Sequence, residues 1–507
     1  MNALLTPLTL TLSEPSSADK TADWERLLDR LRHEAGIAVP VDIDPTLLRS
    51  LSPRLREHAW RLSCVLGHGR ERSMIVSLGS PSAFAAAVDI GTTNIVGSLF
   101  DLATGELIAG IEKRNPQTAV GLDVLTRVHL AMGGKGRELH RMLIEGVNAL
   151  LGELCRGAGL SDRDLQAVAV AGNTIMTHFL LDLAVDNIPV EPYVPVIHRV
   201  DFVDPRSISL AMNPYGVLYV FPNAGSYVGG DIIAGILSSG LYKEREPALL
   251  IDVGTNAEIV LGCDEWIIVG AGAAGPALEG GIAEIGMSAS EGAINEVSIG
   301  PLATSEGETG TGLTVSLHTI GGTQPRGLCG SGMIELVSEL YASGIIDRTG
   351  KFVDDAPCIV AAEGRKGFVI TPTDDGALIL KDTEIENFLR SKAAMFSSLQ
   401  VIVRSVGLKF ADIRKVYVSG AFGMGINVEK AISIGMIPKI PKERFVPVGN
   451  SSLKGAELIL HDRGLLSEID RIAAMITYKE MNTDREFMKE FPAALFIPHT
   501  NPEVLEV

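Results

Sequence analysis

Two turns in this sequence place an aspartate, a glycine and a threonine in the same order. The first follows an apolar stretch that ends at Asp89 and continues into Gly91, Thr92 and Thr93. Backbone N–H groups and hydroxyls of such a turn can bind phosphate oxygens, and glycine lets the chain approach them closely. The aspartate can hold the hydration shell of a magnesium ion. A single turn of this kind is equally typical of a tight hairpin with a solvated aspartate.

The same order recurs further along the chain, after a second apolar stretch. Asp252 follows Asp89 by 163 residues, about one domain length, and leads into Gly254, Thr255 and Asn256. After each motif the sequence predicts a matching hairpin, so the pair indicates an internal repeat. Two matching motifs favour a phosphate clamp closed from both halves over two solvated hairpins.

A third segment, KVYVSGAFGMGIN at 415–427, predicts a strand, a glycine-rich turn and a helix. Its turn contains Gly420, Ala421 and Gly423. Such a turn lets a flat purine or its ribose lie against the backbone. Alone the segment is typical of any nucleotide loop or packing turn, but its place after the second phosphate motif favours adenosine.

The elements behind these motifs predict an α/β fold with two duplicated halves. From Phe84 onwards, short apolar strands alternate with helical segments, including 137–155 with apolar residues on one face and 331–343 in the second half. We expect four parts: a linker arm at 1–25, a small linker domain at 26–80, a first half at 84–245 and a second half at 246–507.

The N-terminal region has a different composition, and the sequence assigns it no chemistry. Its first residues contain the polar run LSEPSSADKTAD, which is typical of a linker. Apolar residues from Trp24 to Leu31 recur at helical spacing. We expect a second helix around Thr46–Leu66, and a strand at SMIVSLG after it.

Composition excludes several classes of function. With 44 Lys and Arg against 62 Asp and Glu, the net charge is −18, which disfavours a nucleic-acid partner. The longest uncharged run, 207–230, contains prolines, asparagines and glycines that would break a membrane helix. The N-terminus lacks the basic region and cleavage site of a secretory signal. We therefore expect a cytoplasmic protein without a membrane partner.

Five cysteines, at 64, 155, 263, 329 and 358, form no C-x-x-C pair. No single segment could supply three or four thiolates to one metal, so we expect no intrinsic iron–sulfur cluster or structural zinc. A cluster bridged between two subunits, with cysteines from each, is the exception that this spacing leaves open.

Several segments resemble a known family. DIGTTN at 89, DVGTNAE at 252 and VSGAFG at 418 resemble the two phosphate motifs and the adenosine motif of the acetate and sugar kinase, heat-shock protein 70 and actin superfamily. Other segments resemble the ATP-dependent reductive activators of corrinoid proteins, from residue 84 to the C-terminus, and SEPSSADKTADWERLL resembles their linker. These other segments are NPQTAVGLDVLTRV at 115, AGNTIMTHFLL at 171, FPNAGSYVGGDIIAGIL at 221, AAGPALEGGI at 273, RGLCGSGMIELVSEL at 326 and EFMKEFPAALFIPHT at 486.

The resemblance implies an actin-like, ribonuclease H-like ATPase fold and a role for each site residue. Asp89 and Asp252 would organise Mg²⁺ through water, and Asn173 and Glu258 would lie near the cleft. Asp231 would orient the attacking water, although an aspartate that caps a helix is an equal alternative. The phosphate contacts would be Thr92, Thr93, Gly254, Thr255 and Asn256, with Gly420, Ala421 and Gly423 along the adenosine.

The resemblance also implies partners. The chain would bind ATP and magnesium, dock on a corrinoid (cobalamin-binding) protein in the Co(II) state and help to return it to Co(I), as a homodimer. Members of this family usually carry a ferredoxin-like domain upstream of the linker, and we expect it to be absent here. The electron would then come from a separate low-potential reductase or ferredoxin.

Two other functions share the fold and the phosphate motifs. A small-molecule kinase would need a catalytic base beside a sugar or acyl pocket, and no specific substrate signature is present. A chaperone-like ATPase would reactivate its partner without any redox step. Transfer of phosphate to an acceptor would identify the first, and reactivation without a reductant would identify the second.

Overall fold

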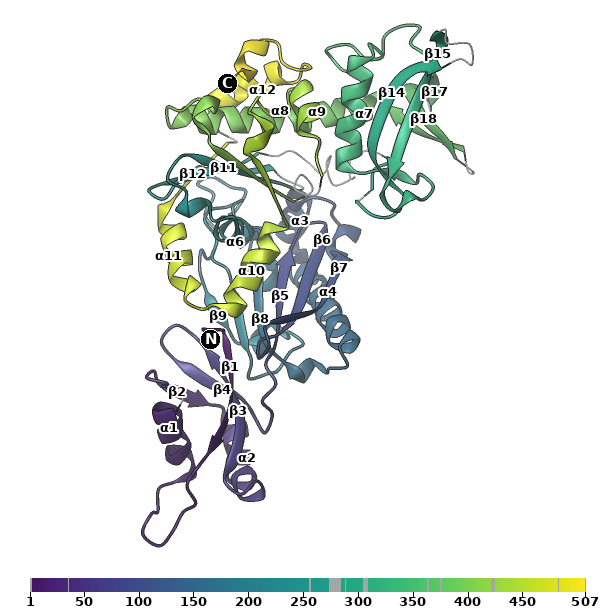
Figure 1. The fold of residues 1–507 in the computed structure, drawn as a ribbon. Helices are drawn as coiled ribbons and strands as arrows, with labels where there is room; N and C mark the ends of the chain where they lie inside the picture. The colour runs from purple at the N-terminus through teal and green to yellow at the C-terminus, as the bar shows by residue number, and fades with distance from the viewer. Residues whose placement is uncertain are drawn as a thin grey trace. The chain divides into compact units, whose positions relative to one another are not determined.

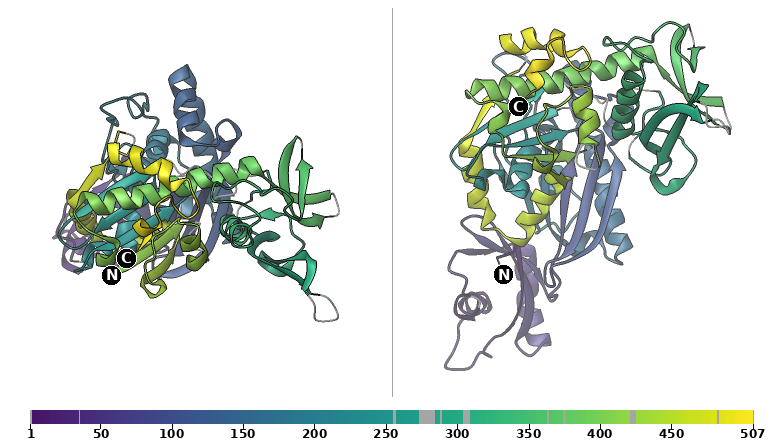
Figure 2. Two further views of the ribbon diagram at one scale, coloured as in Figure 1. Left: turned by 90° about the horizontal axis from the view of Figure 1, so that it is seen from above. Right: turned by 45° about the horizontal axis from the view of Figure 1, so that its top comes forward.

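The computed structural model describes residues 2–34, 36–254, 257–272, 284–287, 289–303, 309–362, 364–373, 376–420, 425–481 and 483–506. The chain forms two compact units (Figures 1 and 2). The first unit comprises Met1–Ser238 and Ser452–Ala474, and the second comprises Ser239–Ser451 and Met475–Val507. The chain therefore passes between the units at three points.

The N-terminal part of the first unit is a small sheet covered by two helices, drawn in purple in Figure 1. Its strands pair in the order β1-β3-β4-β2. Leucines of both helices share one core with alternate residues of β3, so both helices cover the same face. The bounds are β1 Leu5–Thr11, α1 Asp23–Glu34, β2 Val41–Ile43, α2 Pro45–Glu57, β3 Arg61–His68 and β4 Ser73–Leu78.

Two elements here differ from what we expected. Residues 5–11, which we assigned to an extended arm, form β1 and pair with β3. Leucine and threonine alternate over residues 8–11, which is the period of a strand. The helix that we expected around Thr46–Leu66 ends at Glu57. Ala59 and Trp60 adopt positive φ angles of 48° and 63°, which end the helix before β3 begins.

The large sheet of the first unit carries the first phosphate motif. Its strands have the order β7-β6-β5-β8-β10-β9; β5, β6 and β7 are antiparallel, whereas β8 pairs in parallel with β5, and β10 with β8. The central β8 is buried along its whole length, as expected of a parallel strand covered on both faces. The bounds are β5 Phe84–Ile90, β6 Asn94–Asp101, β7 Glu106–Arg114, β8 Leu165–Gly172, β9 Asp201–Val203 and β10 Val217–Val220.

Helices that follow in sequence cover this sheet. The longest, α4, packs on β6 and β7 through leucines and valines at helical spacing, which confirms the helix predicted over 137–155. The bounds are α3 Val124–Leu130, α4 Gly136–Gly157, α5 Thr174–Leu180 and α6 Gly230–Ser239.

A segment from far along the chain completes the first unit. It contains nearly all of α10 (Ser451–His461) and α11 (Leu465–Met475). At Gly455 the backbones of α10 and α6 come into contact, since a Cβ there would lie 2.3 Å from the carbonyl oxygen of Ala234. The Leu4 N–H donates to the Leu460 carbonyl at 2.9 Å. The first unit is thus built from two separate stretches of sequence.

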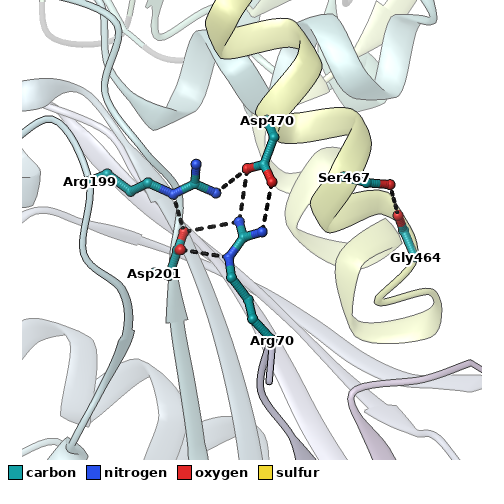
Figure 3. A network of polar contacts seen from close by, with 6 residues as sticks. All are labelled: Arg70, Arg199, Asp201, Gly464, Ser467 and Asp470. Carbon is teal, nitrogen blue, oxygen red and sulfur yellow. Dashed lines mark hydrogen bonds and ion pairs between the residues drawn. The ribbon is translucent and has the colours of Figure 1, made fainter. Parts of the chain in front are cut away.

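Four charged side chains join three segments of the first unit (Figure 3). Arg70, before β4, donates to Asp201 on β9 at 2.7 Å and to Asp470 on α11 at 2.8 Å. Arg199 donates to Asp201 at 2.8 Å and also pairs with Asp470. Burial raises the pKa of Asp201. Because the other three side chains are partly exposed, each pair stabilises the unit by about 1 kcal/mol or less, and the network mainly aligns the segments.

The large sheet of the second unit repeats the plan of the first. Its order is β21-β20-β11-β12-β13-β22, with an antiparallel β11, β12 and β13, and β20 and β21 added in parallel beside β11. When the edge strands β9 and β22 are left out, the remaining strands of the two sheets have the same order and the same relative directions. This confirms the duplicated α/β fold. The bounds are β11 Ala248–Val253, β12 Ala257–Gly262, β13 Ile267–Gly272, β20 Lys415–Gly420, β21 Phe445–Gly449 and β22 Ile476–Lys479.

Between β13 and α8 the second unit carries two further three-stranded sheets. The first packs on α7, which confirms the helix predicted at 331–343, and α8 packs on β12 and β13 as α4 packs on β6 and β7. The bounds are β14 Ala293–Ala303, β15 Thr309–Thr319, β16 Gly327–Leu328, α7 Gly330–Ala342, β17 Ile359–Ala362, β18 Arg365–Thr373, β19 Gly376–Lys381, α8 Asp382–Ser405, α9 Val428–Ser433 and α12 Arg485–Ala494.

No helix within the described ranges combines the length and the apolar character needed to cross a membrane. The uncharged run 207–230 contains β10 and turns.

We expect the small N-terminal sheet to lose stability in mild acid because of His68. Its buried imidazole contacts Ser73 Oγ through Nδ1 at 2.8 Å and Thr6 Oγ1 through Nε2 at 2.9 Å, and burial lowers its pKa to about 4. A histidine in the unfolded chain titrates near pH 6.5, so the unfolded state binds more protons between about pH 6.5 and 4. Stability should fall through this window, by up to about 3 kcal/mol.

Urea unfolding of a Trp266→Phe background would measure this, because both remaining tryptophans report on the small sheet: Trp60 lies in its core, and Trp24 packs against that core. His68→Gln should flatten the pH dependence. If the free energy of unfolding of that variant still falls with pH as in the parent protein, the acid sensitivity belongs to other groups.

Candidate functional site

The first phosphate motif forms the turn between β5 and β6. β5 ends at Ile90 and β6 begins at Asn94, which leaves 91–93 as the turn. A Cβ on Gly91 would lie 2.6 Å from the carbonyl oxygen of Asn94, so this tight turn requires glycine. Thr92 and Thr93 follow in the turn, next to the strand end that carries Asp89.

Parallel pairing of β5 with β8 brings Asn173 to this turn. Ile90 lies opposite Gly172, and Asn173 is the next residue. Its Oδ1 accepts the N–H of Met176 at 2.9 Å and so caps α5, while its Nδ2 donates to Thr92 Oγ1 at 3.2 Å. The structure therefore brings together Asp89, Gly91, Thr92, Thr93 and Asn173 in the first unit.

The glycine-rich loop after β10 packs on the start of α5, at Asn173 and Thr174. Asp231 follows this loop. A Cβ on Gly229 would lie 2.4 Å from Asn173 Cα, and Thr174 Oγ1 donates to the Gly225 carbonyl at 2.6 Å. Asp231 is in the first turn of α6 and accepts the Ile232 N–H at 2.8 Å. A helix cap accepts the N–H two or three residues further on, so this contact is not a cap, and both roles of Asp231 stay predictions.

Sequence reasoning missed Ser452. This residue lies in the first turn of α10, and its Oγ donates to Asp89 Oδ1 at 2.7 Å. No sequence signal relates a serine to an aspartate 363 positions away, because the contact depends on the return of the chain to the first unit.

In the second unit, Asp252 lies between two strands that each place a polar side chain beside it. Glu258 on β12 and Ser419 on β20 are its register partners, and Glu258 is 7% exposed. Residues directly opposite each other share one face of a sheet, so the two carboxylates lie on the same face. Ser419 Oγ donates to Asp252 Oδ2 at 3.0 Å and contacts Ser451 Oγ at 2.7 Å. Ser419 was in our adenosine segment but had no assigned role.

Gly420 brings the backbone of β20 against Asp252. Its φ is +69°, and a Cβ would lie 2.5 Å from the Val253 carbonyl oxygen and 2.7 Å from Asp252 Oδ1. The second unit thus brings together Asp252, Glu258 and Gly420, with Gly254 directly after β11. Four predicted site residues lie outside the described residues: Thr255, Asn256, Ala421 and Gly423.

Mg²⁺ keeps several waters and takes only one or two carboxylates directly. Asp89 in the first unit, and Asp252 with Glu258 in the second, are carboxylates of a number and kind that fit an ion held through water. In the described part of the chain, no three His, Cys, Asp or Glu side chains are grouped to hold a metal. Four cysteines are buried, and burial raises the pKa of Cys64 to about 12 and that of Cys155 to about 11. These two remain protonated thiols, which are poor metal ligands.

We expect Gly420→Ala to destabilise the protein more than a change at a glycine with similar φ but open surroundings. Gly407 has φ +74° and no atom within 4 Å of an added Cβ, so Gly407→Ala measures the backbone strain alone, about 1 to 2 kcal/mol. Gly420→Ala adds the clash with Val253 and Asp252. Chemical unfolding of both variants would measure the difference, and equal losses would contradict the close approach.

Family models match almost the entire chain. The model for the C-terminal domain of RACo, the ASKHA domain, matches residues 246–507. The model for the RACo middle region matches 84–244, and that for the RACo linker region matches 1–81. These matches agree with the resemblance to reductive activators that the motifs indicated.

Two curated proteins and a solved structure are similar to this chain. It is 30% identical over 429 residues to the corrinoid activation enzyme RamQ of Eubacterium limosum, which covers 80% of this chain and 69% of that protein. It is 24% identical over 423 residues to the Co(II) methylated amine-specific corrinoid protein reductase of Methanosarcina barkeri, which covers 78% of this chain and 73% of that protein. The structure of a reductive activator for corrinoid, iron–sulfur protein matches with a TM-score of 0.91 and 34% identity, over 99% of this chain and 80% of that one. Because one family model alone covers more than half of the sequence, the chain belongs to the RACo family.

Proposed function

We propose that this chain is an ATP-hydrolysing enzyme that reactivates a corrinoid protein by promoting the reduction of Co(II) to Co(I) for methyl transfer. The observation that carries the proposal is the match in fold, over nearly the whole chain, to a reductive activator of a corrinoid protein. The names of the two curated relatives also give corrinoid proteins as their targets.

The ATP part of the proposal is supported by the duplicated sheet with a phosphate motif at the same place in each copy. Asp89 and Asp252 would each hold Mg²⁺ through water, and Asp231 would orient the water that attacks the terminal phosphate. Magnesium, when bound, neutralises charge that develops on the phosphate oxygens. Thr92 and Thr93 would donate to those oxygens, because positioning and electrostatics dominate phosphoryl transfer.

Coupling to ATP has a thermodynamic reason. Each 59 mV of an unfavourable one-electron reduction costs about 1.4 kcal/mol, which nucleotide hydrolysis can offset. Hydrolysis does so only if the nucleotide states of the activator bind the Co(II) and Co(I) forms with different affinity. We therefore propose that binding to the corrinoid protein depends on the bound nucleotide.

The electron would come from a separate low-potential donor, a reductase or a ferredoxin. The support is the chemistry of the cysteines, which are scattered in sequence, four of them buried. Free thiols also suit a reducing compartment, so we propose a cytoplasmic protein. A homodimer is proposed from the family resemblance alone.

Asp89→Ala and Asp252→Ala should each lower magnesium-dependent ATP hydrolysis at least tenfold, about 1.4 kcal/mol or more of transition-state stabilisation. A matched control is Asp101→Ala, because Asp101 lies on the same hairpin but pairs with Phe84, at the opposite end of the sheet from Asp89. Steady-state release of phosphate measures all three variants. Wild-type turnover in both motif variants would contradict the assignment.

With a corrinoid partner, ATP and magnesium, the protein should generate Co(I) only when a low-potential donor such as reduced ferredoxin or Ti(III) is present. Anaerobic absorbance would follow the loss of the Co(II) band and the growth of the Co(I) band. Asp252→Ala should abolish the ATP stimulation. Reactivation without a reductant would favour the non-redox ATPase, and transfer of phosphate from ATP to a small acceptor would favour the kinase.

A further inference from the structure

Two buried side chains donate hydrogen bonds to the backbone of the first phosphate turn from behind. Asn115 Nδ2 donates to the Gly91 carbonyl at 2.9 Å, and Arg127 Nη2 donates to the Thr92 carbonyl at 2.6 Å. Both side chains are completely buried. They come from the segment that follows β7, and neither has a role in the function proposed above.

Arg127 is held by neutral acceptors only. Its Nε donates to the Gly121 carbonyl at 2.9 Å and its Nη1 to Gln117 Oε1 at 3.0 Å. Gln117 is itself buried and fixed by a bond to the Leu139 carbonyl at 2.8 Å. The Asp123 carboxylate, at the N-terminus of α3, acts on Arg127 through space and favours its charged form, but no direct ion pair joins the two side chains within the described residues. Burial lowers the pKa of Arg127 to about 10, so it stays protonated at neutral pH.

A buried charge without a direct ion pair costs more free energy than a neutral donor at the same place would. Transfer of an ion into a protein interior is unfavourable even after relaxation, and carbonyl acceptors offset only part of the lost hydration. Asn115 shows that a neutral amide can hold the neighbouring carbonyl of the same turn. The charge on Arg127 therefore needs a reason beyond the hydrogen bond that it makes.

The orientation of the peptides gives that reason. In a trans peptide the C=O and the N–H point in opposite directions. Because the Gly91 and Thr92 carbonyls point towards Asn115 and Arg127, the N–H groups of Thr92 and Thr93 point away from these two side chains. A donor on the carbonyl also polarises the peptide and strengthens its N–H as a donor.

We propose that Arg127 and Asn115 are positioning residues that orient the N–H groups of Thr92 and Thr93 for phosphate, and that the buried charge of Arg127 attracts the ligand in proportion to its negative charge. This rests on the proposed function and deepens it, since it states how the first turn distinguishes ATP from less charged nucleotides. It also explains the segment NPQTAVGLDVLTRV: a Cβ on Gly121 would lie 3.0 Å from Arg127 Cγ, so this segment wraps around the arginine.

Arg127→Gln tests the proposal, because it removes the charge and keeps an amide donor. Calorimetric titration should show that ATP binds at least tenfold more weakly to the variant, ADP is affected less, and adenosine changes by less than twofold. Arg127→Lys, which keeps the charge on a single donor group, should recover part of the ATP affinity. Substitution of a residue with a purely structural role would lower the affinity for ATP, ADP and adenosine equally.

Arg26→Gln is the control, since Arg26 on α1 is also buried and donates to the Thr21 carbonyl, but it lies beside the small N-terminal sheet and pairs with Asp19. It should lower the melting temperature without changing the ratio of ATP to adenosine affinity. Equal losses for ATP and adenosine in Arg127→Gln, or a loss for ATP below threefold, would overturn the proposal.

If Arg127→Gln does not fold, Arg127→Lys and Asn115→Ala decide the question by the same ratio of affinities. Both variants should lose more affinity for ATP than for adenosine. An unchanged ratio of ATP to adenosine affinity in both would overturn the proposal. Absence of ATP binding by the wild-type protein would overturn the proposed function together with this inference, whereas wild-type binding with insensitive variants would overturn the inference alone.

Discussion

In each unit, the first strand of a hairpin pairs in parallel with a strand that arrives from elsewhere in the chain. Parallel strands end at the same edge of the sheet, where open α/β sheets collect their ligand-binding groups. Thus the pairing of β5 with β8 sets Asn173 beside Thr92, and the pairing of β11 with β20 sets Ser419 beside Asp252. A shift of one residue in either register would turn these side chains to the other face. The places of Asn173 and Ser419 in the two motifs depend on this pairing.

Local sequence patterns predicted much of this arrangement, and non-local contacts account for what they missed. The repeated hairpins and α4 follow from periods of two and 3.6 residues. The strand β1 has an alternation of leucine and threonine only over residues 8–11, and so short a pattern is a weak signal. The bond from Ser452 to Asp89 has no local signal, because it requires the chain to leave the first unit and return. Arg127 lay in a family segment, yet only its burial and its acceptors reveal what it holds.

The arginines of the first unit show how the surroundings decide what one residue type does. Arg70 and Arg199 pair with carboxylates at a partly exposed position, where water screens the attraction and where geometry matters more than energy. Arg127 is buried and donates only to neutral acceptors, with the Asp123 carboxylate acting on it through space and without a direct ion pair in the described part of the chain. The field of a buried charge is screened less than that of an exposed one, so it reaches further across the turn. Counting charges in the sequence could not distinguish these cases.

The return of residues 452–474 to the first unit limits how such a protein can be divided. The family model for the C-terminal domain spans 246–507 and so includes α10 and α11, although these helices pack with the first unit. A fragment that begins at residue 246 would carry two helices whose packing partners, among them Ala234 and Leu4, were left behind. Recombination between homologous genes meets the same restriction, since a single crossover would combine an α6 from one parent with an α10 from the other. Gly455 and the backbone that it touches must therefore be inherited together.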